Sequence, residues 1–242
     1  MKKDKIYIYG RHALKEALMS APQAITKIFL ADRNDVELEA LIKKSGISVG
    51  ELSSASIEND ASHQGVIGSI SPEKLIRKYE GFFEKYTVTP NSLFVFLDGL
   101  QDPQNVGAII RSAVAFGASG VIIPEREQAP ITGTVAKTSA GMVFRVPIIT
   151  TGSVLDTIKD LKNKGFTIYG MDGESKNMIQ DEAFNDPTVF IMGNESKGLS
   201  KEVFTVCDKL VSIPMDQKCE SLNVAVSAGI ALYTKRLKNI KI

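Results

Sequence analysis

Short apolar runs recur along the chain from residue 93 onward, and segments with helical spacing of apolar residues separate most of them. The runs lie at 93–97, 120–123, 146–149, 166–169, 188–192 and 209–213. Continuous apolar runs of this length are typical of strands that are buried on both faces. Strands that alternate with helices indicate a largely parallel sheet covered on both sides, so the pattern predicts an α/β fold.

Two of the intervening segments carry clear helix signals. A Ser-x-x-Asp sequence at 153–156 resembles a capping box, and Gly165 is a natural C-terminal stop for the helix that it opens. A second helix begins near Pro103 and Asn105. Its apolar residues form one stripe at Val106, Ile109, Ile110, Ala113 and Val114. Asn105 suits an N-cap position, and Arg111 lies off the buried stripe.

The preceding residues show a different organisation. Residues 1–70 alternate helical and strand-like stretches, at 10–18, 27–30, 36–44 and 63–70. Residues 71–92 are charged and aromatic, with prolines near both ends and weak strand character. We therefore predict a small α/β domain over 1–70, a linker over 71–92 and a larger domain over 93–242.

Composition and charge fit a folded protein of the cytoplasm. Hydrophobic residues make up 43% of the chain and charged residues 24%, enough for a core and too little net charge for disorder. The chain contains no run of about 20 apolar residues, so no membrane helix is predicted. The net charge of +1 does not by itself indicate a nucleic-acid partner. Cations near the C-terminus suit either a helix dipole or an RNA contact, at Lys235, Arg236, Lys238 and Lys241.

Several classes of chemistry lack their residues. There is no P-loop, and no Gly-x-Gly-x-x-Gly opens a helix. His12 and His63 both lie in the N-terminal unit, so a histidine-based triad has no base in the large domain. Cys207 and Cys219 have neither Cys-x-x-Cys spacing nor histidines nearby, so we expect no zinc site.

Glycine-rich or polar loops close four of the apolar runs, at 98–105, 170–173, 193–198 and 214–223. Parallel sheets bind ligands beyond the carboxyl ends of their strands. Glycines there let the backbone approach a ligand closely, so an adenosine site fits these loops. Tight turns explain any one of the loops equally well.

The last helical segment is apolar on two sides. One face contains Leu222, Ala225, Val226, Gly229, Leu232 and Tyr233, and the other Val224, Ala228 and Ala231. Such a helix must be covered on both sides, either within the chain or by a second subunit.

Together the loops resemble the three motifs of the SpoU, or TrmH-type, RNA 2′-O-methyltransferase family. The matching segments are 102–111 with 115–117, then 193–199, then 213–215 with 221–229. Segments 9–18 and 63–65 resemble the L30e-like RNA-binding domain of one branch of the family, which includes bacterial 23S rRNA guanosine-2′-O-methyltransferases.

The resemblance implies a SPOUT fold with a C-terminal trefoil knot, S-adenosylmethionine as methyl donor, and a homodimer with composite sites. The loops contain no cluster of metal ligands, so we expect no metal. General folding rules alone would predict an unknotted, doubly wound sheet. The family resemblance also places the polar active-site residues at Asn105, Arg111, Glu195, Ser221 and Asn223. The cofactor-binding residues that it implies are Met171, Asp172, Gly173, Ile191, Met192, Gly193, Gly198, Ile213, Met215 and Leu222.

Two positions depart from the family pattern, because Ser196 and Gln217 stand where glycine is frequent. The resemblance makes Arg111 the residue that assists removal of the hydroxyl proton. A guanidinium with a pKa above about 12 is a poor base, so we favour a role in holding a phosphate or the developing alkoxide. A true arginine base stays an alternative.

For RNA contacts we select Arg11, His12 and Gln64 in the small domain, although local hydrogen bonds or a solvated face also explain them. We expect guanosine 2′-O-methylation of 23S rRNA. The alternatives are a tRNA 2′-O-methyltransferase, a non-catalytic rRNA-binding or ribosome-assembly factor with the same fold, and a metabolic enzyme of Rossmann type.

Overall fold

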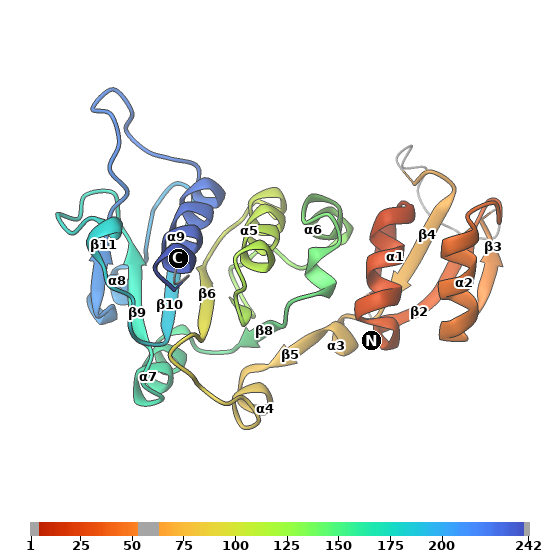
Figure 1. Cartoon of the computed structure of the whole chain (residues 1–242), viewed down its shortest axis with the longest axis horizontal. Helices are drawn as coiled ribbons and strands as arrows, with labels where there is room; N and C mark the ends of the chain where they lie inside the picture. Colours follow the sequence, from red (N-terminus) through yellow and green to blue (C-terminus); the bar gives the residue numbers. More distant parts are fainter. Residues whose placement is uncertain (1–4, 53–62, 240–242) are drawn as a thin grey trace.

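The computed structural model describes residues 5–52 and 63–239, which form two sheets with helices packed against them (Figure 1). The larger sheet has seven strands in the order β11-β9-β10-β6-β7-β8-β5, and its neighbouring strands pair in parallel. Its strands are β5 (Ile76–Lys78), β6 (Leu93–Asp98), β7 (Gly120–Pro124), β8 (Ile148–Thr151), β9 (Thr167–Met171), β10 (Thr188–Gly193) and β11 (Lys209–Val211). All six apolar runs are therefore strands, and the predicted parallel α/β fold is confirmed.

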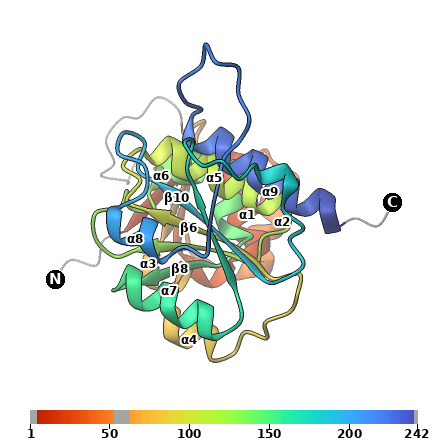
Figure 2. The same cartoon turned by 90° about the vertical axis from the view of Figure 1, so that its left-hand side faces the viewer.

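Helices cover both faces of this sheet (Figure 2). One face carries α5 (Pro103–Ala115), α6 (Gly133–Thr138) and α9 (Val224–Asn239). The other carries α4 (Tyr79–Phe83), α7 (Val154–Asn163) and α8 (Lys201–Val206). The central strands have almost no exposed surface, as Phe94, Phe96 and Phe190 show at 0% exposure, whereas the edge strands β5 and β11 are partly exposed. A sheet buried on both faces explains the continuous apolar runs of the sequence.

The two helix signals have different outcomes. Ser153 caps α7 as predicted, since its hydroxyl accepts a hydrogen bond from the Asp156 amide at 3.3 Å. The predicted cap of α5 is wrong, because Asp102 caps that helix by accepting from the Gln104 amide at 2.8 Å. Asn105 lies within the first turn, so its side chain is available for other contacts.

The predicted linker belongs to the large sheet. Residues 71–92 contain α3 (Pro72–Leu75), β5 and α4. β5 pairs with β8 as an edge strand, and the aromatic side chains of α4 pack on Phe94 and Phe166. A three-residue edge strand is too short to produce a visible period, and its partner lies 72 residues away in the sequence. The weak strand character of the segment thus coexists with one short strand, which its pairing with β8 determines.

The N-terminal unit is a four-stranded sheet with the order β1-β4-β2-β3. Its elements are β1 (Ile6–Tyr9), α1 (Arg11–Ser20), β2 (Ile25–Leu30), α2 (Val36–Ser45), β3 (Val49–Glu51) and β4 (Val66–Ile70). It packs closely on the large domain, because the buried Glu16 carboxylate accepts two hydrogen bonds from Arg145, at 2.5 and 3.0 Å. At Gly133 an added Cβ would lie 2.1 Å from the Tyr7 carbonyl oxygen, so only glycine fits where β1 meets α6.

The segment between β9 and β10 is fastened to the chain that follows β11. The Ser212 amide donates to the Asn177 carbonyl at 2.9 Å, and the Ile179 amide donates to the Ser212 carbonyl at 2.9 Å. Farther along, the Lys235 ammonium of α9 donates to the Phe184 carbonyl at 2.6 Å and the Asp186 carbonyl at 3.1 Å. This crossing lies where the family resemblance predicts the knot. Lys235 is only 1% exposed, which excludes the RNA contact that the sequence left open for it.

Within residues 5–52 and 63–239, no helix combines the length and the apolar character that a membrane span requires.

Candidate active site

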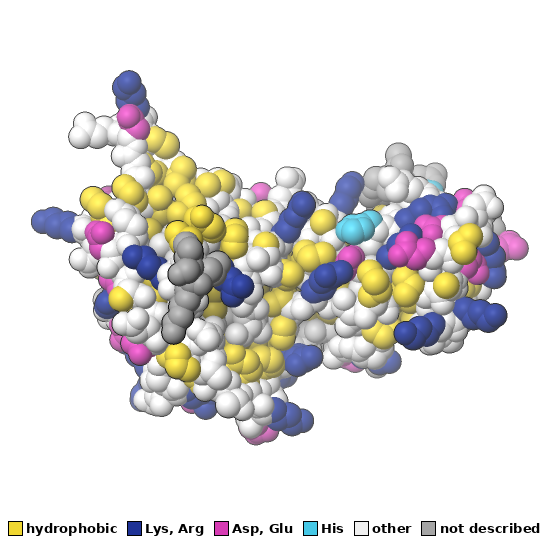
Figure 3. All heavy atoms as spheres, viewed as in Figure 1, with side chains coloured by type: hydrophobic (Ala, Val, Ile, Leu, Met, Phe, Trp, Pro, Cys, Tyr) yellow, Lys and Arg dark blue, Asp and Glu magenta, His cyan; other side chains and the backbone are white. Residues whose placement is uncertain are grey.

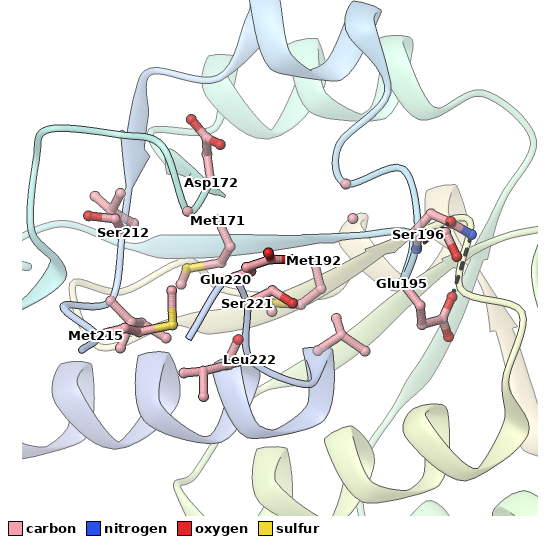
Figure 4. Close-up of a pocket in the computed structure, with 18 residues that line it drawn as sticks. Met171, Asp172, Met192, Glu195, Ser196, Ser212, Met215, Glu220, Ser221 and Leu222 are labelled. Atoms are coloured by element: carbon pink, nitrogen blue, oxygen red, sulfur yellow. Dashed lines mark hydrogen bonds between the residues drawn. The ribbon is translucent and has the colours of Figure 1, made fainter. Parts of the chain in front are cut away.

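A cavity of about 320 Å³ opens at the carboxyl ends of β9, β10 and β11. This volume lies at the lower end of the range for small-molecule sites, about 300–1,000 Å³. Figure 4 shows Met171, Met215 and Leu222 at one end of the cavity, with Glu195 and Ser196 at the other. The chain between β11 and α9 projects from the body as a long loop and supplies part of the wall (Figure 1).

Nearly all the predicted cofactor-binding residues line this cavity: Met171, Asp172, Gly173, Met192, Gly193, Gly198, Ile213, Met215 and Leu222. Ile191 is the exception among the ten. Its side chain is fully buried in the apolar layer beneath α7, because alternate residues of β10 point to opposite faces of the sheet.

The turn after β10 shapes one side of the cavity. The amides and carbonyls of Asn194 and Gly198 bond each other at 2.8 and 2.9 Å, which folds the turn back onto the strand. An added Cβ at Gly193 would lie 2.3 Å from the carbonyl carbon of Gly198, so a side chain at Gly193 would displace the turn. Ser196 fits at its tip, where its amide donates to Asn194 at 3.0 Å. Gln217 is exposed on the projecting loop and does not line the cavity.

The Glu195 carboxylate is held by three hydrogen bonds from the start of α5. One oxygen accepts from the Asn105 side chain and the Asp102 amide, and the other from the Gln101 amide, each at 3.2 Å. Burial raises the pKa of Glu195, but the hydrogen bonds from these amides and from its own amide outweigh it and lower the pKa overall. The carboxylate therefore stays ionised at neutral pH.

Asn223 joins this network from the start of α9. Its side-chain amide donates to the Asn105 oxygen at 3.0 Å. Its own oxygen accepts from the amides of Ala225 and Val226 at 2.9 and 3.4 Å, which caps α9. The capping role and the site role of Asn223 are therefore combined. A continuous chain runs from Glu195 through Asn105 to Asn223, and Ser221 lines the cavity beside it.

Arg111 is not part of this arrangement. It lies six residues after Asn105 on α5, which places it roughly 120° around the helix and about 9 Å along it. Its side chain is exposed and makes no hydrogen bond or ion pair with residues 5–52 or 63–239. Within one chain the structure thus brings together Asn105, Glu195, Ser221 and Asn223 but leaves Arg111 outside.

Sequence reasoning missed three residues that build the site. The Asn194 side chain donates to the Gly99 carbonyl at 2.8 Å and accepts from the amides of its own turn. Asp98 accepts from the Ser200 amide at 2.9 Å, and Gln101 donates to the Glu127 carbonyl at 2.7 Å. For Asp98 and Asn194 the available signal was an Asp or Asn at the last position of a strand or just beyond it, where such side chains fold loops; Gln101 carries no such signal.

The predicted RNA-contact residues lie together at one end of the small sheet. The Gly10 amide donates to the Val66 carbonyl at 3.0 Å, which holds the segments of Arg11 and Gln64 side by side. His12 and Gln64 are exposed. Arg11 forms ion pairs with Asp32 at 3.1 Å and Asp35 at 3.6 Å, and the hydrogen bond to Asp32 is the main reason that its pKa is raised. Lysine and arginine side chains are spread over the face shown in Figure 3.

The lining of the cavity determines what it can hold. Three methionines and Leu222 provide polarizable apolar contacts, the glycine loops present backbone groups, and Asp172, Glu195 and Glu220 contribute carboxylates. This combination suits a flat heterocycle joined to a cationic centre. No cluster of three or more metal-binding side chains occurs in the part of the chain that the structure describes.

Comparison with known proteins gives two family matches. Residues 92–233 match the model of the SpoU rRNA Methylase family, and residues 7–75 match the model for RNA 2′-O ribose methyltransferase substrate binding.

Similar proteins extend over almost the whole chain. A putative TrmH family tRNA/rRNA methyltransferase of Staphylococcus haemolyticus is 34% identical, over 95% of this chain and 94% of its own. The 23S rRNA (guanosine-2′-O-)-methyltransferase RlmB of Photobacterium profundum is also 34% identical, over 93% and 95%. The crystal structure of AviRb from Streptomyces viridochromogenes, a SpoU methyltransferase in complex with AdoMet, superposes with a TM-score of 0.84 at 22% identity, covering 98% and 92%.

Proposed function

The chain belongs to the SpoU rRNA methylase family, and from this premise we propose that it methylates a ribose 2′-hydroxyl of structured RNA with S-adenosylmethionine as donor. A guanosine of 23S rRNA is the substrate that we favour, because a relative named for that activity matches over 93% of the chain. The proposal is carried by the hydrogen-bond network that joins Glu195, which lines the cavity, to Asn105 and Asn223, which line the adjoining groove. The residues lie on three separate elements, so the fold has to bring them together.

The cavity fits this donor. Met171, Met215 and Leu222 would hold the adenine and the carbon chain, and the backbone of the glycine loops would bond the polar edges. Nearby carboxylates, among them Asp172 and Glu220, complement the positive charges of a sulfonium and an α-amino group. When bound, S-adenosylmethionine supplies a methyl group on a cationic sulfur that departs as a neutral thioether.

The residues of the chain then have positioning and electrostatic tasks. The ionised Glu195 fixes Asn105 and the start of α5, and Asn105 with Asn223 presents amide groups where the ribose enters. Arg111 would hold the RNA phosphate or the developing alkoxide, so that the hydroxyl proton passes to water as the C–O bond forms. Ser221 lies on the cavity wall, where it can bond the ribose or the donor.

A second copy of the chain would complete the site. On the outer face of α9, Val226, Tyr233 and Leu237 are 49%, 51% and 44% exposed, at the i, i+7 and i+11 spacing of one helical stripe. The groove beside it, between α5 and α9, is lined by Asn105 and small residues. A homodimer that buries this stripe would bring Arg111 of one protomer toward the cavity of the other.

The N-terminal unit would bind the RNA outside the reacting nucleotide. This role is supported by the match to the substrate-binding family model and by the grouping of His12 and Gln64 at one exposed end. Arg11 would reach the RNA by exchanging its ion pairs with Asp32 and Asp35 for a phosphate. We retain residues 1–70 and 93–242 as the two functional parts. β5 and α4, which lie between these ranges, are added to the larger part. A cytoplasmic site of action follows from the proposed RNA substrate.

The test is transfer of a radiolabelled methyl group from S-adenosylmethionine to total RNA of a strain that lacks this protein. We expect label at a ribose 2′-O of 23S rRNA with wild type and with Lys159→Ala, a control for loss of one exposed charge on α7. Arg111→Ala should abolish the label. Label on tRNA alone would show that the substrate is tRNA and not 23S rRNA. No transfer to RNA or ribosomal subunits by folded protein would favour the non-catalytic assembly factor.

A further inference from the structure

A larger cavity lies where the N-terminal unit meets the sheet domain. Its volume is about 840 Å³, and its walls come from β1, the segment from α3 to β5, the ends of β7 and β8, and residues 128–133. Figure 1 places these elements at the junction of the two units. Because β7 and β8 are parallel to β10, the cavity opens along the same edge of the sheet as the candidate active site.

The walls are mostly apolar and include two tyrosines, Tyr7 and Tyr9. Ring and aliphatic side chains come from both units: Ile6, Tyr7, Ile76, Ile123, Pro130 and Ile131. Surfaces of this kind bind flat, uncharged ring systems.

Two residues of the cavity wall each have a buried polar atom without a hydrogen-bond partner. Within the described residues, three side-chain nitrogen or oxygen atoms are buried without a hydrogen bond, and two of them, Gln128 Nε2 and Thr132 Oγ1, belong to the cavity wall. The orientation of the Gln128 amide is determined, because its oxygen accepts from the Leu100 amide at 3.0 Å. Its NH2 group is therefore a donor that lacks an acceptor. Buried polar atoms without partners commonly mark the place of a ligand or an ordered water.

The charges at the rim favour a neutral ligand. Lys5, Lys78, Glu73 and Glu125 contribute two positive and two negative charges. Lys78 and Glu125 already form an ion pair with each other. The rim thus has no excess positive charge to hold a phosphate inside the cavity, whereas a phosphate at its open side stays in water.

The cavity is connected to the active-site loop. Gln128 holds the Leu100 amide, and the Ala129 amide donates to the Leu100 carbonyl at 2.7 Å. The next residue, Gln101, donates its backbone amide to Glu195. A ligand bound to Gln128 would therefore stabilise the loop that orients the Glu195 carboxylate.

From these features we propose that the junction cavity receives one unstacked base of the RNA, separate from the nucleotide that is methylated. This inference rests on the proposed function in that the substrate is RNA. The base lies between the isoleucines and Tyr7. It accepts a hydrogen bond from Gln128 Nε2 and forms a second hydrogen bond with the Thr132 hydroxyl. Splayed bases held by stacking and by edge hydrogen bonds are the usual basis of single-stranded RNA recognition. Occupation of the cavity thereby reports correct RNA docking to the active-site loop.

The test uses the full chain labelled with 13C at isoleucine methyl groups, with S-adenosylhomocysteine present. Each of the four ribonucleoside 5′-monophosphates is added while the methyl signals are followed. We expect at least one nucleotide to shift the signals of Ile6, Ile76, Ile123 and Ile131, which line the junction cavity. Ile213 lines the other cavity and reports binding of S-adenosylhomocysteine.

Two variants probe the unpartnered atoms. Thr132→Val removes the hydroxyl at constant shape, and Gln128→Glu keeps the acceptor for Leu100 but replaces the donor. Each should weaken nucleotide binding about threefold to tenfold, the effect of one hydrogen bond. Thr134→Val, at an exposed position of α6 that does not line the cavity, should bind like wild type.

The absence of shifts at these four isoleucines with every nucleotide up to about 10 mM would overturn the proposal. Wild-type affinity in both variants would overturn it as well. A pentaribonucleotide should bind at least about tenfold more tightly than the mononucleotide; equal affinity would instead make a free nucleotide the ligand. A failure of the proposed methyl-donor site would be distinguishable from a failure of the junction cavity. In that case S-adenosylhomocysteine would leave the Ile213 signal unchanged, while the nucleotide would still shift the junction signals.

Discussion

Replacing Lys235 by methionine should weaken the attachment of α9 to the segment between β9 and β10 and so lower the stability of the fold. Lys235 is 1% exposed on α9, and its ammonium donates to the carbonyls of Phe184 and Asp186 at 2.6 and 3.1 Å. Methionine preserves most of the apolar stem but provides no donor, so two carbonyls of the segment between β9 and β10 lose their partner.

The size of the effect can be worked from these contacts. A hydrogen bond from a charged group contributes about 1.5–3 kcal/mol. The bond to Phe184 is buried and is lost in full, whereas water can partly replace the bond to Asp186. These contributions are net of the cost of burying the ammonium, a cost that also lowers the pKa of Lys235. We expect a net loss of about 2 kcal/mol in the free energy of unfolding, or about 4–8 °C in Tm.

Urea and thermal unfolding followed by circular dichroism measure this loss. Lys238→Met is the matched control, because Lys238 is exposed on the same helix. Since the folded protein holds the Lys235 proton less tightly than the unfolded chain, wild-type stability relative to the variant should rise as the pH approaches about 10.4 from below. A change below about 0.5 kcal/mol for Lys235→Met, or an equal change for Lys238→Met, would refute this account.

Three further predictions concern the active site. Arg111→Ala and Glu195→Ala should each be inactive, but a mixture refolded together should recover about a quarter of wild-type methyl transfer if the site is shared between protomers; no recovery argues against a composite site. Because the pKa of Glu195 is lowered, the stability advantage of wild type over Glu195→Gln is present above about pH 4.3 and disappears as the pH falls through the folded-state pKa; acid titration of both proteins, monitored by fluorescence of an extrinsic dye, would reveal a constant difference if this is wrong. Asn223→Ala should lose about 1 kcal/mol through the missing helix cap, whereas Asn223→Asp keeps the cap and loses the donor to Asn105; thermal unfolding and methyl-transfer assays should therefore separate stability from activity, and equal behaviour of the two variants would contradict the double role.

The periodic features of the chain could be predicted from the sequence alone. Six strands of the large sheet and the helix after Ser153 follow from apolar runs and capping residues, which act through neighbours in the sequence. Nine of the ten residues proposed for the donor site line one cavity, because the carboxyl ends of parallel strands meet at one edge. The family motifs supplied their identity, which periodicity could not.

Only the tertiary structure decided the features that depend on distant partners. β5 is a strand because β8 lies beside it, Asn105 is a bridge between Glu195 and Asn223 because Asp102 already caps the helix, and Lys235 is buried by a segment that precedes it by some 50 residues. The junction cavity likewise arises from residues of both units. A side chain's hydrogen-bond partners are determined by which backbone groups the folded chain leaves unsatisfied nearby, and local sequence does not contain that information.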